Sequence, residues 1–261
     1  ALCRGQDYVF HLAALIAIPY SYDAPSSYVQ TNVQGTLNIL RGALDAGVSG
    51  VIHTSTSEVY GTAQYTPITE DHPLQGQSPY SASKIGADMM AESFARSFEL
   101  PVITMRPFNT YGPRQSERAV ISSVIRQIID DRCDSIRIGD TSPTRDFNYV
   151  GDTANAFMKI APLIPKHAGS VFNAGSGQMF SIGEMIEMAV KLTGCSKPIV
   201  KEPARIRPVK SEVLALMADA SRFSALSGWA PQTSLEAGLE RTVEWWRQRT
   251  DAIRSDSRYM V

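Results

Sequence analysis

Short apolar segments rich in strand-forming residues alternate with longer, helix-like segments along this chain of 261 residues. The short segments that stand out are residues 7–12, 50–54, 101–105 and 170–174. A helix is predicted at residues 26–46, closed by Gly47, and another at residues 79–98, with Ser78 and Pro79 at its start. Strands that alternate with helices in this order form a parallel sheet with crossover helices. The predicted fold class is therefore α/β.

After Arg106 the sequence pattern changes, and loops rich in proline and glycine separate shorter elements. The elements predicted there are helices at residues 120–130, 182–193 and 235–247 and strands at residues 135–138 and 198–201. We expect these pieces to form a smaller lobe that is interleaved with the last strands of the sheet.

Composition excludes several classes of partner. A formal charge of −1 with both signs interspersed gives no basic surface for nucleic acid or an anionic membrane. The longest apolar run, residues 12–19, is much shorter than the roughly 20 residues that a membrane span needs. Three isolated cysteines fit unpaired thiols in a reducing compartment better than a disulfide framework or a metal site. We expect a cytoplasmic protein without a metal.

Tyr80 and Lys84 lie four residues apart in the predicted helix 79–98 and therefore share one face of it. The ammonium of Lys84, together with a cationic nicotinamide cofactor, is expected to favour the ionised phenol and so to lower the pKa of Tyr80. Taken alone, this spacing describes a surface tyrosine and lysine on an amphipathic helix more often than an active site.

The segment Ser55-Thr56-Ser57-Glu58 directly follows the predicted strand 50–54. Its side chains should lie at the carboxyl edge of the parallel sheet, where open α/β sheets bind ligands. A hydroxyl-rich loop that caps a strand is the simpler interpretation of the segment by itself. If the helix with Tyr80 packs beside this strand end, the hydroxyls, the carboxylate, the phenol and the ammonium form an acid/base site.

Motifs spread over nearly the whole chain resemble those of the extended short-chain dehydrogenase/reductases that act on nucleotide sugars. In chain order they are residues 11–14 (HLAA), 32–36 (NVQGT), 55–61 (STSEVYG), 80–84 (YSASK), 106–114 (RPFNTYGPR), 144–150 (TRDFNYV), 173–177 (NAGSG) and 207–213 (RPVKSEV). The resemblance implies an enzyme with a Rossmann-like, doubly wound sheet, NAD as cofactor and a nucleotide sugar as substrate.

The resemblance also implies a role for individual residues. Tyr80 would be the base for the sugar 4-hydroxyl, Lys84 would hold the nicotinamide ribose, and Thr56 would bond to the same sugar oxygen. The further residues expected to contact the cofactor are His11, Leu12, Ala13, Ala14, Asn32, Ser55 and Pro107. The further residues expected to contact the substrate are Asn109 for the sugar diphosphate and Arg145 and Arg207 for the nucleotide phosphates. For Asn109, turn formation is an equally good account, and either arginine could be a solvated surface charge.

The resemblance places an NAD-binding domain at residues 1–108 plus about 146–175 and a nucleotide-sugar-binding lobe at residues 109–145 plus 176–261. The family's glycine-rich turn for the cofactor pyrophosphate, G-x-x-G-x-x-G, does not occur before Asp7. The predicted sheet is therefore incomplete at its N-terminal side, by roughly 60 to 80 residues if each strand-plus-helix unit takes about 30. The NAD-versus-NADP determinant would lie there too.

Glu58 distinguishes among the reactions of such enzymes. A 4-epimerase has no obvious task for a carboxylate at this position, whereas a 4,6-dehydratase needs one to remove the C5 proton. Ser57 stands where many dehydratases have the aspartic acid that protonates the departing hydroxyl, so Glu58 would have to pass on its own proton. We expect a 4,6-dehydratase, most similar to those of the legionaminic-acid type of pathway, that acts on a UDP- or GDP-linked N-acetylhexosamine.

Other possibilities stay open. The same segment occurs in UDP-glucuronate decarboxylases, and 4-epimerases share most of the motifs. A non-catalytic protein that keeps the fold for dimerisation is a further possibility, because helices 26–46 and 79–98 usually pair across a two-fold axis in this family. A homodimer through these helices is expected in either case.

Overall fold

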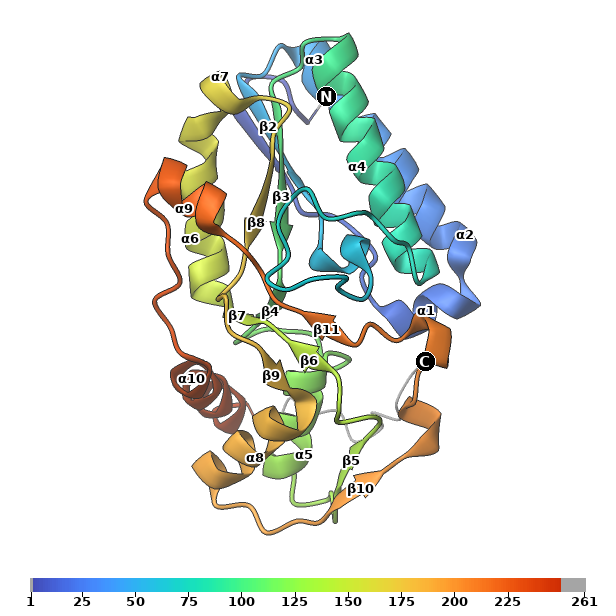
Figure 1. Ribbon diagram of the computed structural model, residues 1–261, viewed down its shortest axis with the longest axis vertical. Coiled ribbons are helices and arrows are strands. Elements are labelled where there is room, and N and C mark those ends of the chain that lie inside the picture. The colour runs from blue at the N-terminus through green and yellow to red at the C-terminus, as the bar shows by residue number, and fades with distance from the viewer. Residues whose placement is uncertain (1, 250–261) are drawn as a thin grey trace.

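A four-stranded parallel sheet with helices on both faces forms the upper half of the computed structural model, which describes residues 2–249 (Figure 1). Residue 1 and residues 250–261, at the outer ends of the two predicted domains, lie outside the described residues. The strand order is β1-β2-β3-β8, and every neighbouring pair is parallel. These strands are β1 (Tyr8–His11), β2 (Gly50–Thr54), β3 (Val102–Pro107) and β8 (Val171–Ala174). The predicted parallel α/β sheet is thus confirmed.

Successive residues of the inner strands point to opposite faces of this sheet, as the two-residue period of a strand requires. Val51 and Val102 pack in one core cluster with residues of α3 (Gly35–Ala46) and α4 (Pro79–Ser97). Ile52 and Ile103 pack in another with residues of α6 (Val150–Ile160). The further helices on that second side are α7 (Ile164–His167) and α9 (Ser221–Ser227). Helices on both faces make the sheet doubly wound, as predicted.

The first of the predicted helices is built from several pieces. After α1 (Ile18–Asp23), the chain runs through α2 (Pro25–Tyr28), the π-helical segment η1 (Val29–Gln34) and then α3. Gly47 ends α3 with a φ of 64°, a left-handed conformation that glycine adopts without steric cost. The sequence predicted the ends of this segment but not its π-helical turn, which inserts an extra residue into the helical repeat.

Helix α4 begins where the sequence predicted because two reciprocal hydrogen bonds cap its N-terminus. The hydroxyl of Ser78 accepts a hydrogen bond from the backbone N–H of Ser81 at 3.1 Å, and the hydroxyl of Ser81 accepts one from the backbone N–H of Ser78 at 2.9 Å. This capping box fixes the first turn, which carries Tyr80, close to the carboxyl edge of the sheet.

The lower half of the molecule combines short strands with helices (Figure 1). The remaining strands are β4 (Asn109–Tyr111), β5 (Ile136–Ile138), β6 (Thr144–Arg145), β7 (Phe147–Tyr149), β9 (Phe180–Ser181), β10 (Ile199–Lys201) and β11 (Ala215–Leu216). The helices there are α5 (Val120–Ile129), α8 (Ile182–Thr193) and α10 (Leu235–Arg247). The 3₁₀ turns within residues 2–249 are η2 (Ser57–Tyr60) after β2, η3 (Ala161–Leu163) between α6 and α7, η4 (Pro203–Arg205) and η5 (Val209–Ser211). The strands pair as β10-β5, β11-β6-β9 and β4-β7.

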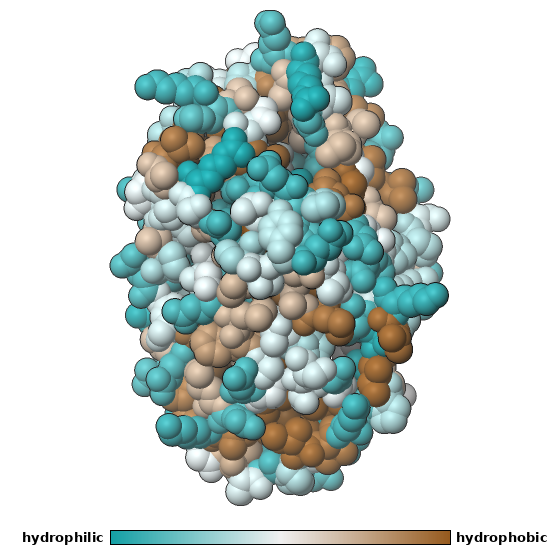
Figure 2. All heavy atoms as spheres, in the orientation of Figure 1, coloured by the Kyte–Doolittle hydropathy of each residue, from teal (hydrophilic) through white to brown (hydrophobic). Residues whose placement is uncertain are grey.

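The lower half has a core of its own, in which α5, α8 and α10 pack together through residues such as Val124, Ile186 and Leu239. Figure 2 shows polar and apolar side chains mixed over the face drawn, with apolar ones gathered over its lower end, where β5 and β10 lie. One segment of the predicted smaller lobe belongs elsewhere. Phe223 of α9 packs against Phe172 of β8, with ring centroids 5.8 Å apart, so this helix covers the sheet rather than the lower core.

Candidate active site

A cavity of about 460 Å³ lies at the carboxyl edge of the sheet and is lined by residues of both halves of the molecule. The predicted site residues that line it are Ser55, Thr56, Ser57, Glu58, Tyr80, Pro107, Asn109, Arg145 and Arg207. The predicted site residues that do not line it are His11, Leu12, Ala13, Ala14, Asn32 and Lys84. The predicted catalytic side chains, apart from Lys84, therefore face one space.

The turn η2 carries the hydroxyl and carboxylate side chains of the site directly after β2. Thr56 caps this turn, since its hydroxyl accepts a hydrogen bond from the backbone N–H of Glu58 at 3.2 Å. Gly61, with a φ of 65°, ends it. Ser57 and Glu58 are buried but border the cavity, so both can act on a molecule bound inside it.

The phenol of Tyr80 lies against this turn. The hydroxyl of Thr56 lies close enough to favour the ionised phenol, and the ring of Tyr28 packs edge-on against the ring of Tyr80 at 6.2 Å. Burial raises the pKa of Tyr80 above its ordinary value of 10, and the Thr56 hydroxyl only partly opposes this. The sequence predicted a lowered pKa; the chain by itself produces the opposite direction, because burial outweighs the favourable contacts.

Lys84 lies one helical turn beyond Tyr80, beneath the end of β2. Its Nζ donates a hydrogen bond to the carbonyl of Thr54 at 2.6 Å, and the side chain is only 4% exposed. Burial lowers the pKa of Lys84, and the negative charge of Asp88 opposes this shift. Within residues 2–249 the hydrogen bond found for the ammonium goes to this carbonyl rather than to the phenol, so the predicted direct approach is not observed.

The loop after β1 is held in place by Asn32 of η1. Its side-chain amide accepts a hydrogen bond from the backbone N–H of Leu15 at 2.8 Å and donates to the carbonyl of Leu15 at 3.0 Å and the hydroxyl of Ser83 at 2.9 Å. The loop presents exposed apolar side chains beside the sheet edge, with Leu12 at 59% and Ile16 at 64% exposure. His11 is buried before this loop, and its Nε2 pairs with the hydroxyl of Thr36 at 3.1 Å.

The nicotinamide end of a dinucleotide fits these surroundings. The ammonium of Lys84 is buried, and so is the hydroxyl of Thr54, which has no hydrogen-bond partner among residues 2–249; both can meet ribose hydroxyls. The apolar loop after β1 and Pro107 can meet a flat ring. In the described part of the chain, no strand of the sheet is followed by a G-x-x-G-x-x-G turn, and we assign none of its residues to a pyrophosphate.

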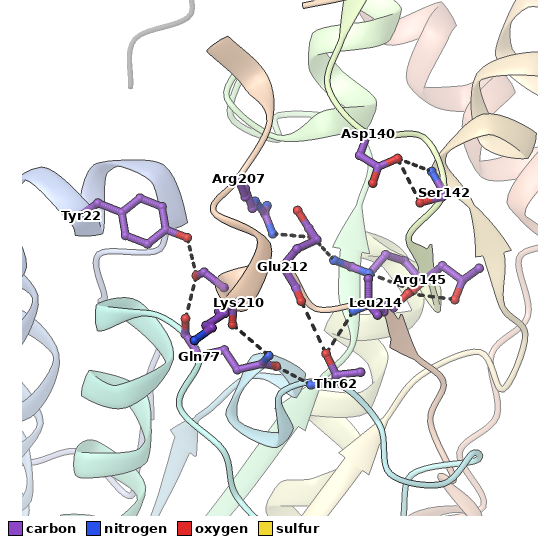
Figure 3. Close-up of polar contacts among 12 residues, drawn as sticks. Tyr22, Thr62, Gln77, Asp140, Ser142, Arg145, Arg207, Lys210, Glu212 and Leu214 are labelled. Carbon is purple, nitrogen blue, oxygen red and sulfur yellow. Dashed lines mark hydrogen bonds and ion pairs between the residues drawn. The ribbon is translucent and has the colours of Figure 1, made fainter. Parts of the chain in front are cut away.

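The far side of the cavity carries two arginines that share one carboxylate (Figure 3). Arg145 Nη2 lies 3.0 Å from Glu212 Oε1, and Arg207 Nη1 lies 3.4 Å from the same oxygen. The backbone beside Glu212 is fastened by the hydroxyl of Ser211, which donates to the carbonyl of Gln77 at 2.6 Å. Arg145 also interacts with the carboxylate of Glu58, so two guanidinium groups face two carboxylates here. Their forked N–H donors suit the oxygens of a phosphate group.

Asn109 of β4 provides a second indication of a ligand. Its side-chain Oδ1 is buried and has no hydrogen-bond partner in the described residues, although the side chain borders the cavity. Buried polar atoms are almost always paired, so this acceptor is available to a hydroxyl or amide of a bound molecule.

The arrangement as a whole provides a phenol, a carboxylate and two hydroxyls around one space, with cations at its far side. These groups can move protons at two positions of a bound anionic molecule. Sequence reasoning missed Glu212, although the quoted motif 207–213 contains it, and missed Asp88, which the four-residue spacing from Lys84 could have indicated. Among residues 2–249, we find no cluster of metal-ligating side chains and no helix long and apolar enough to cross a membrane.

Comparisons with known proteins identify relatives of this chain. The profile of the GDP-mannose 4,6 dehydratase family matches residues 4–242. The chain is similar to a UDP-glucose 4-epimerase from Mycolicibacterium smegmatis, with 32% identity over 93% of this chain and 76% of the relative. It resembles the structure of the dTDP-glucose 4,6-dehydratase DesIV from Streptomyces venezuelae with NAD bound, at a TM-score of 0.85 and 30% identity over 96% and 76% of the two chains. It also resembles UDP-glucuronic acid 4-epimerase from Bacillus cereus with UDP-glucuronic acid and NAD, at a TM-score of 0.85 and 29% identity over 93% and 76%.

Proposed function

Because the chain belongs to the GDP-mannose 4,6 dehydratase family of short-chain dehydrogenase/reductases that act on nucleotide sugars, we propose that it is an NAD-dependent nucleotide-sugar 4,6-dehydratase. Its relatives carry out C4 chemistry on nucleotide sugars, as dehydratases and as 4-epimerases. The observation that favours dehydration is the Glu58 carboxylate, which borders the same cavity as the phenol of Tyr80 and lies near enough to act on its charge.

NAD is the cofactor, as in the solved relatives that hold it. Bound NAD would accept the hydride from C4 of the sugar and return it to C6. Lys84 and Thr54 would hold the ribose next to the nicotinamide, and Pro107 would flank the ring.

Tyr80 would take the proton from the sugar 4-hydroxyl while hydride leaves C4. Its pKa is raised in the chain alone, so ionisation of the phenol depends on the positive charge of Lys84 and of the oxidised cofactor. The Thr56 hydroxyl favours the ionised phenol and would hold the sugar 4-oxygen against it.

Glu58 would then act on the 4-keto sugar. The ketone acidifies the C5 proton, the carboxylate removes it, and the C6–oxygen bond breaks as water leaves. Ser57 is a weak acid, so the departing oxygen would take its proton from Glu58 itself. Hydride then returns to C6 and a proton to C5, which leaves a 4-keto-6-deoxy sugar and no net oxidation.

The nucleotide would lie across the lower half of the cavity. Arg145 and Arg207 would meet the diphosphate, and the unpaired Oδ1 of Asn109 would accept a hydrogen bond from the sugar nucleotide. We propose a UDP- or GDP-linked N-acetylhexosamine as substrate, a homodimer through α2, η1, α3 and α4 as the assembly, and the cytoplasm as the location.

The second candidate function is that of a 4-epimerase. Several relatives carry this name, among them a UDP-glucuronate 4-epimerase with 34% identity. The observation in its favour is Ser57, since a buried serine in place of an acid does not help a hydroxyl to leave. A UDP-glucuronate decarboxylase is the third possibility.

Incubation of the full-length protein and NAD with UDP-N-acetylglucosamine, the corresponding GDP sugars and UDP-glucuronate tests the proposal, with products read by mass spectrometry. Loss of one water supports the dehydratase. A product of unchanged mass with altered chromatographic retention supports the epimerase, and loss of carbon dioxide supports the decarboxylase. A Tyr80→Phe variant is the control that should abolish any of these reactions.

A further inference from the structure

Asp88 is a buried acid on α4 that the proposed mechanism does not use. It lies one helical turn beyond Lys84 and two turns beyond Tyr80, and only 3% of it is exposed. Its carboxylate accepts hydrogen bonds from three side chains, namely His53 Nε2 of β2 (3.0 Å), Ser55 Oγ just after β2 (2.7 Å) and Arg106 of β3 (3.3 Å from Nε and 3.2 Å from Nη2). We call these four residues the Asp88 cluster.

The Asp88 cluster joins the two segments that carry the site. Ser55 directly precedes Thr56, so its bond to Asp88 fixes the start of the turn η2 relative to α4. Arg106 also donates from Nη1 to the hydroxyl of Tyr60, the last residue of η2, at 3.0 Å. Both ends of the turn that holds Glu58 are therefore fastened, through one carboxylate, to the helix that holds Tyr80.

The charges around Lys84 give Asp88 a second role. Lys84 and Asp88 interact electrostatically with each other and with His11 from β1, His53 from β2 and Arg106 from β3. Asp88 also acts on Tyr80 of the same helix, where its negative charge adds to burial in raising the pKa of the phenol. Burial lowers the pKa of both histidines, which are therefore neutral at neutral pH, and Arg106 is a cation. Asp88 supplies the negative charge that opposes the loss of the Lys84 proton.

We propose that Asp88 is a positioning residue, which sets Tyr80 and Lys84 in register with Thr56 and Glu58 and keeps Lys84 in its ammonium form. The proposal rests on the proposed function for the roles of these four residues. Asp88 itself does not border the cavity and would touch neither substrate nor cofactor.

The charge of Lys84 is measured without substrate or cofactor, so this arm does not depend on the reaction. Lysines labelled with ¹³C at Cε are titrated by NMR in the wild-type protein, in Asp88→Asn and in Glu92→Gln, and the Lys84 signal is assigned by its loss in Lys84→Met. Glu92 is the matched control, because it lies one turn further along α4 in an ion pair with Arg96. Lys84 should lose its proton at lower pH in D88N and at an unchanged pH in E92Q. An unchanged Lys84 titration in folded D88N overturns the proposal.

The second arm measures activity with the substrate that the mass-spectrometric test identifies. We expect D88N to lower kcat by at least about tenfold, since a positioned acid/base group contributes about 10² to 10⁴ in rate and Asp88 acts by positioning such groups. KM should change little because Asp88 touches no ligand. The pH profile of kcat should also move, since a merely structural role would change its height alone. A D88N profile of unchanged shape contradicts the proposal. If no nucleotide sugar reacts, the proposed function fails, and the titration still decides the role of Asp88.

If D88N does not fold, the variant Asp88→Glu and the wild-type protein still test the proposal. Asp88→Glu keeps the charge, so Lys84 should titrate as in the wild type while kcat falls because the bonds to Ser55 and Arg106 are displaced. In the wild-type protein, Lys84 should be an ammonium at neutral pH. A neutral wild-type Lys84 overturns the proposal without any variant.

Discussion

Glu58 is the residue on which the choice of reaction depends. We expect Glu58→Gln, which keeps size and polarity but cannot take a proton, to lower kcat for dehydration by about 10² to 10⁴. Oxidation at C4 should persist, so reduced nicotinamide should accumulate and be visible in its absorbance. Glu240→Gln, on the exposed surface of α10, is the control and should behave as the wild type. Full activity in E58Q would exclude Glu58 as the base at C5.

His11 gives the protein a stability that depends on pH. Burial, reinforced by His53 and Lys84, lowers the pKa of His11 from 6.5 to about 4. Between these values the unfolded chain binds more protons than the folded one, so stability is lost as pH falls through this range. We expect the Tm to fall from pH 6.5 to pH 4 and His11→Gln to flatten this dependence.

The matched control for His11 is His167, at the end of α7, which packs against Phe172 rather than against another histidine. His167→Gln should leave the slope of Tm against pH unchanged in differential scanning calorimetry. An H11Q protein that shows the full wild-type slope would mean that His11 is not the group that titrates.

Local spacing explains which site residues were predictable. Thr56, Glu58 and Tyr80 follow from a strand end and a helix start, and both depend on neighbours in sequence. The raised pKa of Tyr80 was not predictable in this way, because it results from burial by distant parts of the chain. Glu212 was missed for the same reason, since its bond to Arg145 joins segments 67 residues apart.

At the scale of elements, the capping box of α4 fixes where Tyr80 lies. Ser78→Ala removes the hydroxyl that accepts from the Ser81 N–H, which should lower the free energy of unfolding by about 1 kcal/mol. Urea unfolding followed by circular dichroism measures this. Ser93→Ala is the control on the same helix, because the hydrogen bond found for that hydroxyl in the described part of the chain goes back to the carbonyl of Met90, and alanine favours the helix. Equal losses in both variants would show that the cap contributes nothing.

Elements with local end signals were predicted best. Helix α8 runs from Ile182 to Thr193 as expected, because Ser181 and Glu184 form a capping box and Gly194 ends the helix with a φ of 66°. The two-residue strands β6, β9 and β11 were not predicted, since each is defined only by pairing with the others. The π-helical turn of η1 could not be predicted, because the spacing of apolar residues in this segment does not distinguish it from an α-helix.

At the scale of the whole molecule, the predicted sheet and its two helical layers are confirmed, while the division into lobes depends on where the last segments pack. Nothing local in residues 221–229 indicates that α9 and Trp229 join the sheet core instead of the lower half. An amphipathic segment can bury its apolar side against the sheet or against the lower core. The prediction followed sequence order and therefore placed α9 in the lower half, whereas it packs on the sheet.

The proposed homodimer is a prediction at this scale. Helices η1 and α4 pack side by side and expose large apolar side chains, with Val29 at 55% and Met89 at 41% exposure. A stable dimer covers such groups over about 800 Å² per partner. Replacing both by glutamate would bury charge in that interface, which is strongly unfavourable. We therefore expect the wild type to sediment as a dimer in analytical ultracentrifugation and the double variant Val29→Glu, Met89→Glu to sediment as a monomer.

Met158 provides the matched control for this experiment. It lies on α6, on the opposite side of the sheet, and is 69% exposed, so it offers a similar side chain to solvent without belonging to the proposed interface. Met158→Glu should remain a dimer, which separates loss of an interface from a general effect of added charge. A wild-type monomer at micromolar concentration, or a double variant that still dimerises, would place any contact between copies on another surface.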